Sequence, residues 1–306
     1  MGIIDEIKES FRNGNTLHKL IYLNLGLFLI VQIVRIVLYL SNSYDLFPQF
    51  LNYLAVPANL ETLAHRPWTL VTYMFLHVDF IHILFNLLWL YWFGTLFIQE
   101  LGLKKLLSTY LIGGLAGGIL YVVFYNLFHV FQGVKDTSIA LGASASIMAV
   151  VVATATYQPE RRMHLILIGP VKIVYIALVM FILTSLVDFS SNTGGKIAHI
   201  GGALTGFLIA YYYRRGKDLT RGFDRFMDNV ATWFKPRKDR MKVTYRRTSE
   251  QKSPPPPPPA DDIEYNRQKA EEQHEIDRIL EKISKGGYDS LTSREKELLF
   301  RMGNKK

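Results

Sequence analysis

The sequence predicts an all-α membrane protein with six transmembrane helices, and three observations lead to that fold class. Hydrophobic residues make up 49% of the 306-residue chain although its formal net charge is +9, a combination that soluble domains rarely show. Six apolar segments approach the roughly 20 residues that a helix needs to cross a hydrocarbon core of about 30 Å. Lysine and arginine gather in alternate connections between these segments, as expected when successive helices cross a membrane in opposite directions.

The predicted membrane helices follow one another up to residue 213. Their bounds are Leu20–Leu40, Phe80–Ile98, Leu106–Phe128, Gly142–Tyr157, Val171–Phe189 and Ile197–Tyr213. The first 19 residues contain no continuous apolar core, so we expect no cleavable signal peptide and assign targeting to the first span. Within the loop Ser41–Asp79, the apolar stretch Leu46–Val56 is too short to cross the membrane and is bounded by prolines, which predicts a membrane-associated first outer loop.

The basic residues of the short connections predict the orientation. They precede the first span, separate the second span from the third and the fourth from the fifth, and fill the chain after the sixth. Those in the first three of these places are Lys8, Arg12, Lys19, Lys104, Lys105, Arg161 and Arg162. Because cytoplasmic connections are enriched in lysine and arginine, both termini are predicted to be cytoplasmic.

The chain after residue 213 changes composition three times. Residues 214–252 contain 13 Lys and Arg against 5 Asp and Glu, with apolar residues at helical spacing among them. This pattern predicts a basic amphipathic juxtamembrane segment on anionic lipid, with nucleic-acid binding as the weaker alternative that we do not expect. Six consecutive prolines make residues 253–262 a stiff linker. Residues 263–306 have helical composition and a capping-box pair, Thr292 and Glu295, which predicts a small helical cytoplasmic module whose partner the sequence does not reveal.

Polar residues within the predicted spans converge on one leaflet. With both termini inside, the second, fourth and sixth spans all begin at the outer face. Their first turns carry His82 and Asn86, Ser144 and Ser146, and His199. Polar groups inside a membrane are costly, so each marks a functional hypothesis. A serine beside a histidine supplies the nucleophile and general base of a serine hydrolase, while a second histidine, an asparagine and a backbone N–H can stabilise an oxyanion.

Each of these motifs also has a structural interpretation. The pentapeptide Gly142–Ser146 is typical of a close-packed helix face, and the spacing of Gly202 and Gly206 again indicates tight helix contact. Asn86 alone more often links two helices by a hydrogen bond, and a single histidine such as His199 is structural about as often as it is functional. The agreement in depth and the complementary chemistry together favour catalysis.

Three stretches resemble motifs of the rhomboid family of intramembrane serine proteases. His82–Gly94, HILFNLLWLYWFG, is similar to the family's His-x-x-x-Asn helix. Gly142–Ala145 is similar to its Gly-x-Ser-x nucleophile motif, and Ala198–Gly206, AHIGGALTG, to its Ala-His-x-x-Gly-x-x-x-Gly motif. The order and loop lengths agree over roughly residues 1–213. The resemblance implies a six-transmembrane-helix rhomboid bundle of bacterial type in the cytoplasmic membrane, with a C-terminal cytoplasmic extension.

The resemblance also implies a role for each matched residue. Ser144 would attack the scissile carbonyl and His199 would take its proton, as a dyad without an acidic member. His82, Asn86 and the backbone N–H of Ser144 would bind the oxyanion. Three glycines would give structural support by permitting close packing: Gly142, Gly202 and Gly206.

Two positions depart from the common family pattern. Many rhomboids carry an arginine where this chain has Thr69, and Arg66 lies three residues earlier. Many also carry a tyrosine that stacks on the histidine, where this chain has Met148. Asp79 and Asp188 are predicted near the outer face. The residues alone therefore leave open a catalytic triad with one of these aspartates as its third member, although the resemblance implies a dyad.

The sequence lacks the motifs of other classes of protease. The chain has no cysteine, which removes disulfides, thiol nucleophiles and thiolate metal sites. His274-Glu275 is followed by Arg278 where a zinc motif needs a second histidine. No Gly-Asp dipeptide occurs, as the paired-aspartate class would need, and Ser146 replaces the last glycine of a hydrolase elbow. No metal or cofactor is therefore expected.

The sequence thus predicts a serine endopeptidase that cleaves single-span membrane proteins near the outer leaflet. The resemblance implies a small residue at the cleavage site and lateral entry near the fifth span. One rival is an inactive rhomboid relative that binds membrane proteins without cutting them. The other is a transporter or channel, which polarity confined to one leaflet disfavours.

Overall fold

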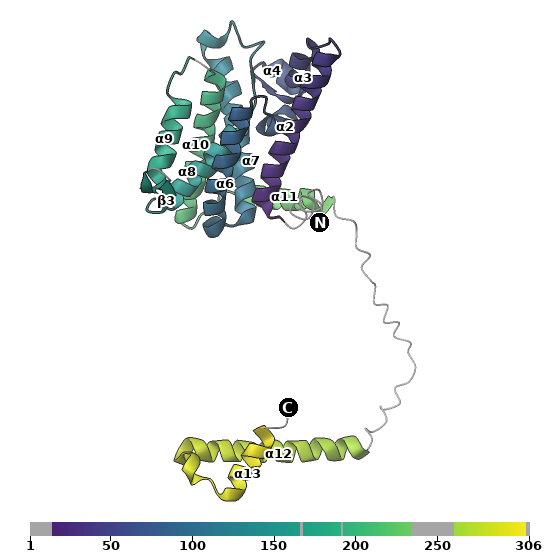
Figure 1. The fold of residues 1–306 in the computed structure, drawn as a ribbon, viewed down its shortest axis with the longest axis vertical. Helices are drawn as coiled ribbons and strands as arrows, with labels where there is room; N and C mark the ends of the chain where they lie inside the picture. The colour runs from purple at the N-terminus through teal and green to yellow at the C-terminus, as the bar shows by residue number, and fades with distance from the viewer. Residues whose placement is uncertain (1–13, 166–167, 191, 234–259, 304–306) are drawn as a thin grey trace. The chain divides into compact units, whose positions relative to one another are not determined.

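The computed structural model describes residues 14–165, 168–190, 192–233 and 260–303 (Figure 1). The chain divides into two compact units, Met1–Arg237 and Lys238–Lys306. A helical bundle fills the first unit and confirms the predicted fold class, an all-α membrane bundle. Its helices are α2 (Thr16–Leu40), α6 (Phe80–Leu101), α7 (Leu103–Leu127), α8 (Ser144–Tyr157), α9 (Ile173–Ser185) and α10 (Thr193–Arg214).

Helix lengths differ across the bundle. Among the described helices, α2, α6 and α7 are long and apolar enough to cross a membrane, whereas α8 and α9 are apolar but have only 14 and 13 residues. At a rise of about 1.5 Å per residue, α8 is roughly 21 Å long and α10 roughly 33 Å. The last residue of α8, Tyr157, contacts Tyr213 near the end of α10, with ring centroids 5.9 Å apart. Because the two helices end at a similar level and α8 is shorter, the first residue of α8 lies deeper in the bundle than the first residue of α10.

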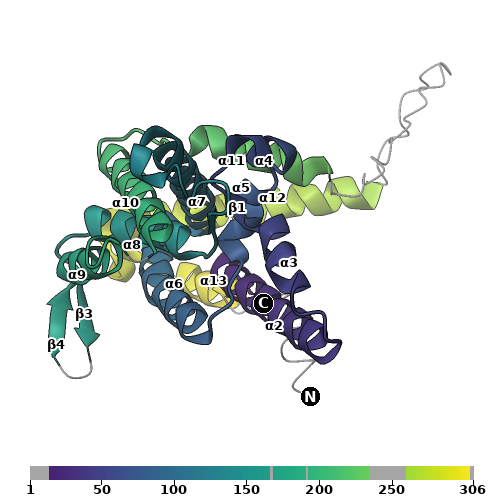
Figure 2. The same ribbon diagram turned by 90° about the horizontal axis from the view of Figure 1, so that it is seen from above.

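Small residues bring α8 close to its neighbours. Figure 2, seen from above, shows α8 among α6, α7, α9 and α10, and it contacts all four. A Cβ on Gly202 of α10 would lie 2.1 Å from the carbonyl oxygen of Ala145, and one on Gly206 would lie 2.1 Å from that of Ala149. A Cβ on Gly113 of α7 would lie 2.2 Å from the Cβ of Ala149. Only glycine permits backbones to approach this closely.

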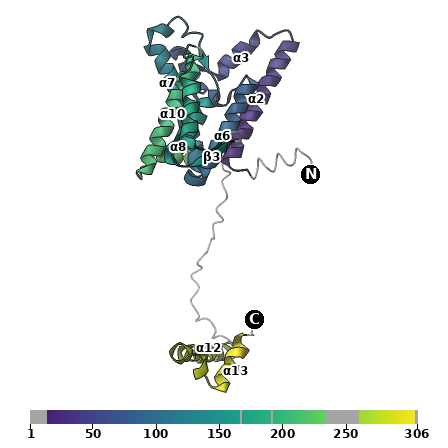
Figure 3. The same cartoon turned by 60° about the vertical axis from the view of Figure 1, so that its left-hand side comes forward.

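The loop before α6 forms a set of short elements at one end of the bundle. They are α3 (Leu46–Leu54), β1 (Val56–Pro57), α4 (Leu60–His65), α5 (Thr69–Thr72) and the 3-10 turn η1 (Tyr73–Phe75). Figure 3 shows α3 beside the upper part of α2, and the two helices are in contact. β1 pairs antiparallel with β2 (Ile139–Ala140), the segment that leads into α8. The loop between α2 and α6 thus contacts the chain just ahead of Ser144.

The position where many rhomboid sequences have arginine, Thr69, is fully buried. Its Oγ1 donates to the carbonyl oxygen of Arg66 at 2.6 Å. Arg66 Nη1 in turn donates to the carbonyl oxygen of Asn52 at 3.2 Å, and Trp68 Nε1 donates to that of Tyr53 at 3.0 Å. Arg66 and Trp68 therefore fasten this part of the loop to α3.

The ends of the predicted fifth span were wrong. Val171 belongs to a hairpin of β3 (Arg162–Leu165) and β4 (Gly169–Lys172), in which it pairs with Met163. Gly169 has a φ of +84° and Pro170 removes a backbone donor, and both features oppose a helix there. α9 begins at Ile173 and ends at Ser185, before the left-handed residue Asp188 (φ 47°). Apolar composition alone overestimated the length of the helix.

Helix α11 (Arg221–Trp233) lies across the other end of the bundle (Figure 1). Its buried Asp224 accepts a hydrogen bond from Ser108 of α7 and lies 3.8 Å from the ammonium of Lys105. Asp218 also pairs with Lys105, and Asp228 pairs with Lys104 at 2.5 Å. These carboxylates neutralise two lysines in the first turn of α7, where positive charge opposes the helix dipole. The rest of the predicted juxtamembrane segment, residues 234–252, lies outside the described residues.

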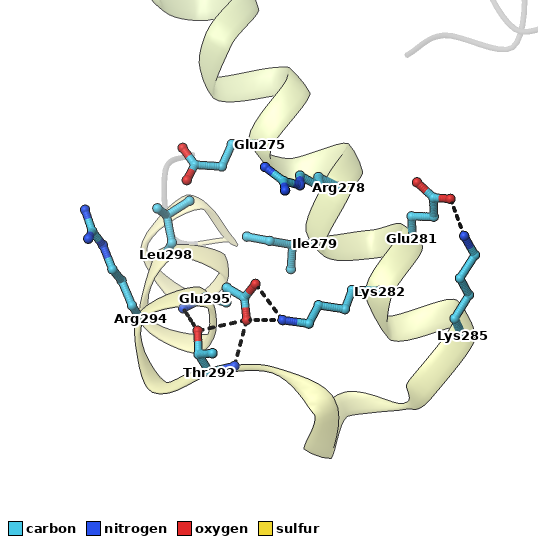
Figure 4. Close-up of a pocket in the computed structure, with 10 residues that line it drawn as sticks. All are labelled: Glu275, Arg278, Ile279, Glu281, Lys282, Lys285, Thr292, Arg294, Glu295 and Leu298. Carbon is cyan, nitrogen blue, oxygen red and sulfur yellow. Dashed lines mark hydrogen bonds and ion pairs between the residues drawn. The ribbon is translucent and has the colours of Figure 1, made fainter.

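The second unit contains α12 (Ala260–Gly286), the 3-10 turn η3 (Tyr288–Ser290) and α13 (Ser293–Gly303). α12 begins three residues before the predicted module boundary at 263, because nothing after Pro259 bars a helix. The capping box is confirmed: the Thr292 N–H donates to Glu295 Oε2 at 2.7 Å, and the Glu295 N–H donates to Thr292 Oγ1 at 3.4 Å. Figure 4 shows Lys282 of α12 reaching the same carboxylate, at 2.9 Å.

Candidate functional site

Ser144 and His199 meet where α8 begins. Ser144 is the first residue of α8, and its Oγ lies 2.7 Å from Nε2 of His199. His199 lies six residues beyond Thr193, the first residue of α10, which is about 9 Å along that helix. The sequence predicted His199 in the first turn of a span that begins at Ile197, but α10 begins four residues earlier, so His199 lies in its second turn. The structure brings Ser144 and His199 together although 55 positions separate them in the chain.

The backbone ahead of Ser144 depends on one glycine. Gly142 has a φ of +127°, a conformation that other residues rarely adopt. Its N–H donates to the carbonyl oxygen of Tyr73 at 2.9 Å, and a Cβ there would lie 3.1 Å from Cε1 of His82. Gly142 thus lets the chain turn into α8 directly beside the His82 ring. The N–H of Ser144, in the first helical turn, has no acceptor within the helix.

The other ring nitrogen of His199 faces a backbone carbonyl. Nδ1 lies 3.1 Å from the carbonyl oxygen of Thr184 in the last turn of α9. Because a carbonyl can only accept, Nδ1 carries the proton, which leaves Nε2 free to accept from the Ser144 hydroxyl. Asp79 instead caps α6 by accepting from the His82 N–H at 2.8 Å, and Asp188 accepts from Ser190 Oγ at 2.8 Å. A carbonyl therefore occupies the place of an acidic third residue.

The two predicted oxyanion residues lie on one face of α6. His82 is beside Gly142, while Asn86 is 5% exposed and its Nδ2 lies 2.9 Å from Nε2 of His77. The amide nitrogen of Asn86 has two protons, so one remains for a further acceptor after His77 is bonded. Both side chains thus border the segment that precedes Ser144.

His77 belongs to this site, and the sequence reasoning missed it. Its ring is fully buried, and Nε2 also accepts the Ala143 N–H at 3.4 Å. Burial, and to a smaller extent the neighbouring His82, lowers the pKa of His77 to about 4. The ring is therefore neutral near pH 7 and can accept from Asn86 and Ala143 together. The signal available in the sequence was a histidine five positions before His82, in a loop rather than in a predicted span.

Ser146, the second serine of the motif, points elsewhere. Its Oγ is buried against α7, where a Cβ on Gly114 would lie 2.3 Å from it. Met148, at the position where many rhomboid sequences carry tyrosine, is 1% exposed and belongs to the bundle core. Within the ranges that the structure describes, no group of three His, Cys, Asp or Glu side chains gathers as metal ligands. The polar chemistry of this region rests on neutral histidine, serine and amide groups.

Comparisons with known proteins match two parts of the chain to protein families. Residues 64–216 match a family model described as the Rhomboid domain, and residues 261–305 match a family of unknown function, DUF6576. The RHOMBOID-like protein 12, mitochondrial, of Arabidopsis thaliana is 30% identical over 162 residues, which cover 50% of this chain and 48% of that protein. The Rhomboid protease GlpG of Yersinia pestis is 26% identical over 170 residues, 56% of each chain. The chain spans about half the length of the curated relatives that it matches.

Proposed function

Because the chain belongs to the rhomboid family, we propose that it is an intramembrane serine endopeptidase that cleaves transmembrane-helix substrates near the outer leaflet. The observation that carries the proposal is the 2.7 Å contact between Ser144 Oγ and His199 Nε2, together with the carbonyl that receives Nδ1. A serine hydroxyl bonded to an imidazole of this tautomer is the arrangement in which a serine becomes a nucleophile.

In the proposed reaction, Ser144 Oγ attacks the carbonyl carbon of the scissile bond while its proton passes to Nε2 of His199. The tetrahedral oxyanion receives hydrogen bonds from the Ser144 N–H, the free Asn86 N–H and His82. When the C–N bond breaks, the imidazolium gives its proton to the leaving amine, and an acyl-enzyme on Ser144 remains. A water, activated by the same imidazole, then hydrolyses the ester and restores the serine.

We further propose that the substrate is a single-span membrane protein that enters laterally near α9. In Figure 2, α6 and α9 lie on either side of α8. Each carries large apolar side chains on its outer surface, such as Phe85 at 53% exposure and Leu183 at 59%. These faces suit a substrate helix that arrives through lipid. A small residue at the cleavage site would let the locally unwound chain approach Ser144 beneath the outer loop.

The remaining sequence predictions stay proposals. They place the protein in a bacterial cytoplasmic membrane with both termini inside. They divide the chain into a membrane domain (1–213), a basic segment on anionic lipid (214–252), a linker (253–262) and a module (263–306). The exposed side chain of Phe226, at 58%, supports lipid contact for α11.

Cleavage by purified protein tests the proposal. We expect reconstituted wild type to cut a model single-span substrate, and Ser144→Ala or His199→Ala to lower the rate by about 10⁴-fold or more. A fluorophosphonate probe should label Ser144, and the His199 substitution should abolish labelling. If wild type and both variants had the same cleavage rate and labelling, the result would contradict the proposal. It would support the alternative, a family member that binds membrane proteins without cutting them.

A further inference from the structure

Lys196 is a buried cation three residues before His199 on α10. The residue is 8% exposed, and an ammonium group this deep is costly unless its protons are hydrogen-bonded. Its Nζ donates to the carbonyl oxygen of Val187 at 2.7 Å and to that of Asp188. Both carbonyls lie in the turn just beyond the last residue of α9. Lys196 of α10 therefore binds the turn that follows α9.

The position of Lys196 just beyond α9 also suits the charge at the end of that helix. The Leu186 and Val187 N–H groups both donate to the Ile182 carbonyl, at 3.0 and 3.1 Å, and the helix ends there. The last carbonyls of a helix lack partners within it and carry a partial negative charge, which a cation stabilises. Asp188 then turns the chain with a φ of 47°. Lys196 therefore holds the turn in place as well as balancing the helix dipole.

His199 engages the same end of α9. Residues three apart share one face of a helix, so Lys196 and His199 approach α9 together. His199 Nδ1 meets the Thr184 carbonyl at 3.1 Å. The Thr184 hydroxyl donates to Met180 within α9 at 2.8 Å, so the His199 contact uses only the backbone of this residue. The position of that carbonyl depends on how the end of α9 is fixed.

We propose that Lys196 is a positioning residue for the dyad. By binding the Val187 and Asp188 carbonyls it fixes the turn that follows α9. It thereby keeps the Thr184 carbonyl against Nδ1 of His199, and Nε2 unprotonated toward Ser144. The partial negative charge at the end of α9 then acts as the orienting group that a carboxylate provides in a triad. The inference rests on the proposed function only for its kinetic consequence, because the orientation of the ring can be measured without catalysis.

Steady-state kinetics give the first test. We expect Lys196→Met to lower kcat roughly tenfold, the value of one or two hydrogen bonds, with KM changed less than about twofold. Lys196→Arg, which keeps a charged donor, should recover most of the loss. One control variant should match wild type: Lys135→Met, which removes a positive charge from the loop between α7 and β2. Thermal melting of each variant reports whether it is folded.

The tautomer of His199 gives the second test. In protein labelled with ¹⁵N-histidine, the His199 signals are assigned by their loss in His199→Gln. We expect the Nδ1-protonated form in wild type and Lys135→Met, and a mixture of tautomers in Lys196→Met. If Lys196→Met is unfolded, Lys196→Gln serves in its place, with a smaller shift in the same direction.

An unchanged tautomer in a folded Lys196 variant would overturn the inference, whether or not kcat falls. If wild type cuts no substrate but the tautomer still depends on Lys196, the proposed function fails and the positioning of His199 stands. The two conclusions are therefore separable.

Discussion

Two polar clusters lie toward opposite ends of the first unit, and they are built from different chemistry. At the dyad, neutral groups meet through single directional contacts, and several donors, such as the second Asn86 N–H, keep capacity for another acceptor. At α11, Lys105 is surrounded by the carboxylates of Asp218 and Asp224 and by the Thr220 hydroxyl. Spare hydrogen-bonding capacity marks a site that receives a ligand, whereas a closed ionic cluster marks a joint that holds two elements together.

The comparison extends to how each cluster is supported. The dyad depends on backbone conformation and close packing, through Gly142, Gly202 and the Thr184 carbonyl. The cluster at α11 depends on side-chain contacts of Lys104 and Lys105, whose long side chains adjust to small displacements. We therefore expect substitutions near the dyad to act through geometry with large effects on rate, and substitutions at the joint to act on stability with small ones.

The largest effect is expected at Gly202. Gly202→Val places a Cβ where the Ala145 carbonyl oxygen lies 2.1 Å away, so α8 and α10 must separate and the dyad contact is lost. We expect no measurable cleavage and a loss of stability of about 3 kcal/mol or more from overpacking. The matched control is Gly26→Val on α2, where a Cβ would meet nothing within 4 Å. Comparable damage by both changes, in melting and cleavage assays, would contradict the packing argument.

Asn86→Ala tests the spare donor. Removal of one side-chain oxyanion donor costs about 10²- to 10³-fold in kcat in serine proteases, so activity should fall without vanishing. KM should change little, because the lost hydrogen bond forms mainly in the transition state. A fall confined to KM would mean that Asn86 binds substrate in the ground state and is no oxyanion donor.

The fold was largely predictable because long apolar segments in the sequence identify helices that can cross a membrane. What failed was the detail at the fifth span, where Val171 is as apolar in a strand as in a helix and the hairpin depends on Gly169 and Pro170. The residues of the site were named in sequence because their shared depth follows from the topology. His77 and Thr184 were not, since a loop histidine has no periodicity to place it and a backbone carbonyl carries no sequence signal at all.

His77→Leu should lower kcat about tenfold, by releasing the hydrogen bonds from Asn86 and Ala143. The decisive measurement is a double-mutant cycle with Asn86→Ala. If His77 acts by orienting Asn86, the double variant should be no slower than Asn86→Ala by more than about twofold, since residues in one network are not additive. Fully multiplicative effects would show that His77 acts through another route. His77→Gln, which keeps an acceptor, should recover part of the rate.

Asp224→Asn tests whether the ionic cluster at α11 affects stability without affecting the cleavage rate. Loss of this buried carboxylate leaves Lys105 with Asp218 and weakens the bond to Ser108, so we expect a loss of about 1–3 kcal/mol in the stability of the first unit. Cleavage should stay within about twofold of wild type, because the joint lies away from the dyad. The exposed pair gives the control: Asp228→Asn should change the melting temperature much less, since exposed ion pairs contribute about 0–1 kcal/mol. A drop in kcat for Asp224→Asn would break the separation of the two clusters.

The smallest effect is expected at the second unit, where Lys282, Thr292 and Glu295 form a cluster near the surface, with the Glu295 side chain 28% exposed. Hydrogen bonds from the Thr292 backbone, the Lys282 ammonium and the Thr292 hydroxyl lower the pKa of Glu295 to about 2 from its ordinary 4.5. A lowered carboxyl pKa stabilises the folded form above the unfolded pKa, and that contribution is lost as the pH falls from about 4.5 through about 2. The helicity of a peptide spanning 260–306, measured by circular dichroism, should therefore decline across this window more in the wild-type peptide than in Glu295→Gln. Identical curves would mean that the capping box adds nothing measurable, and that even a well-formed surface cluster leaves α13 to its intrinsic helix propensity.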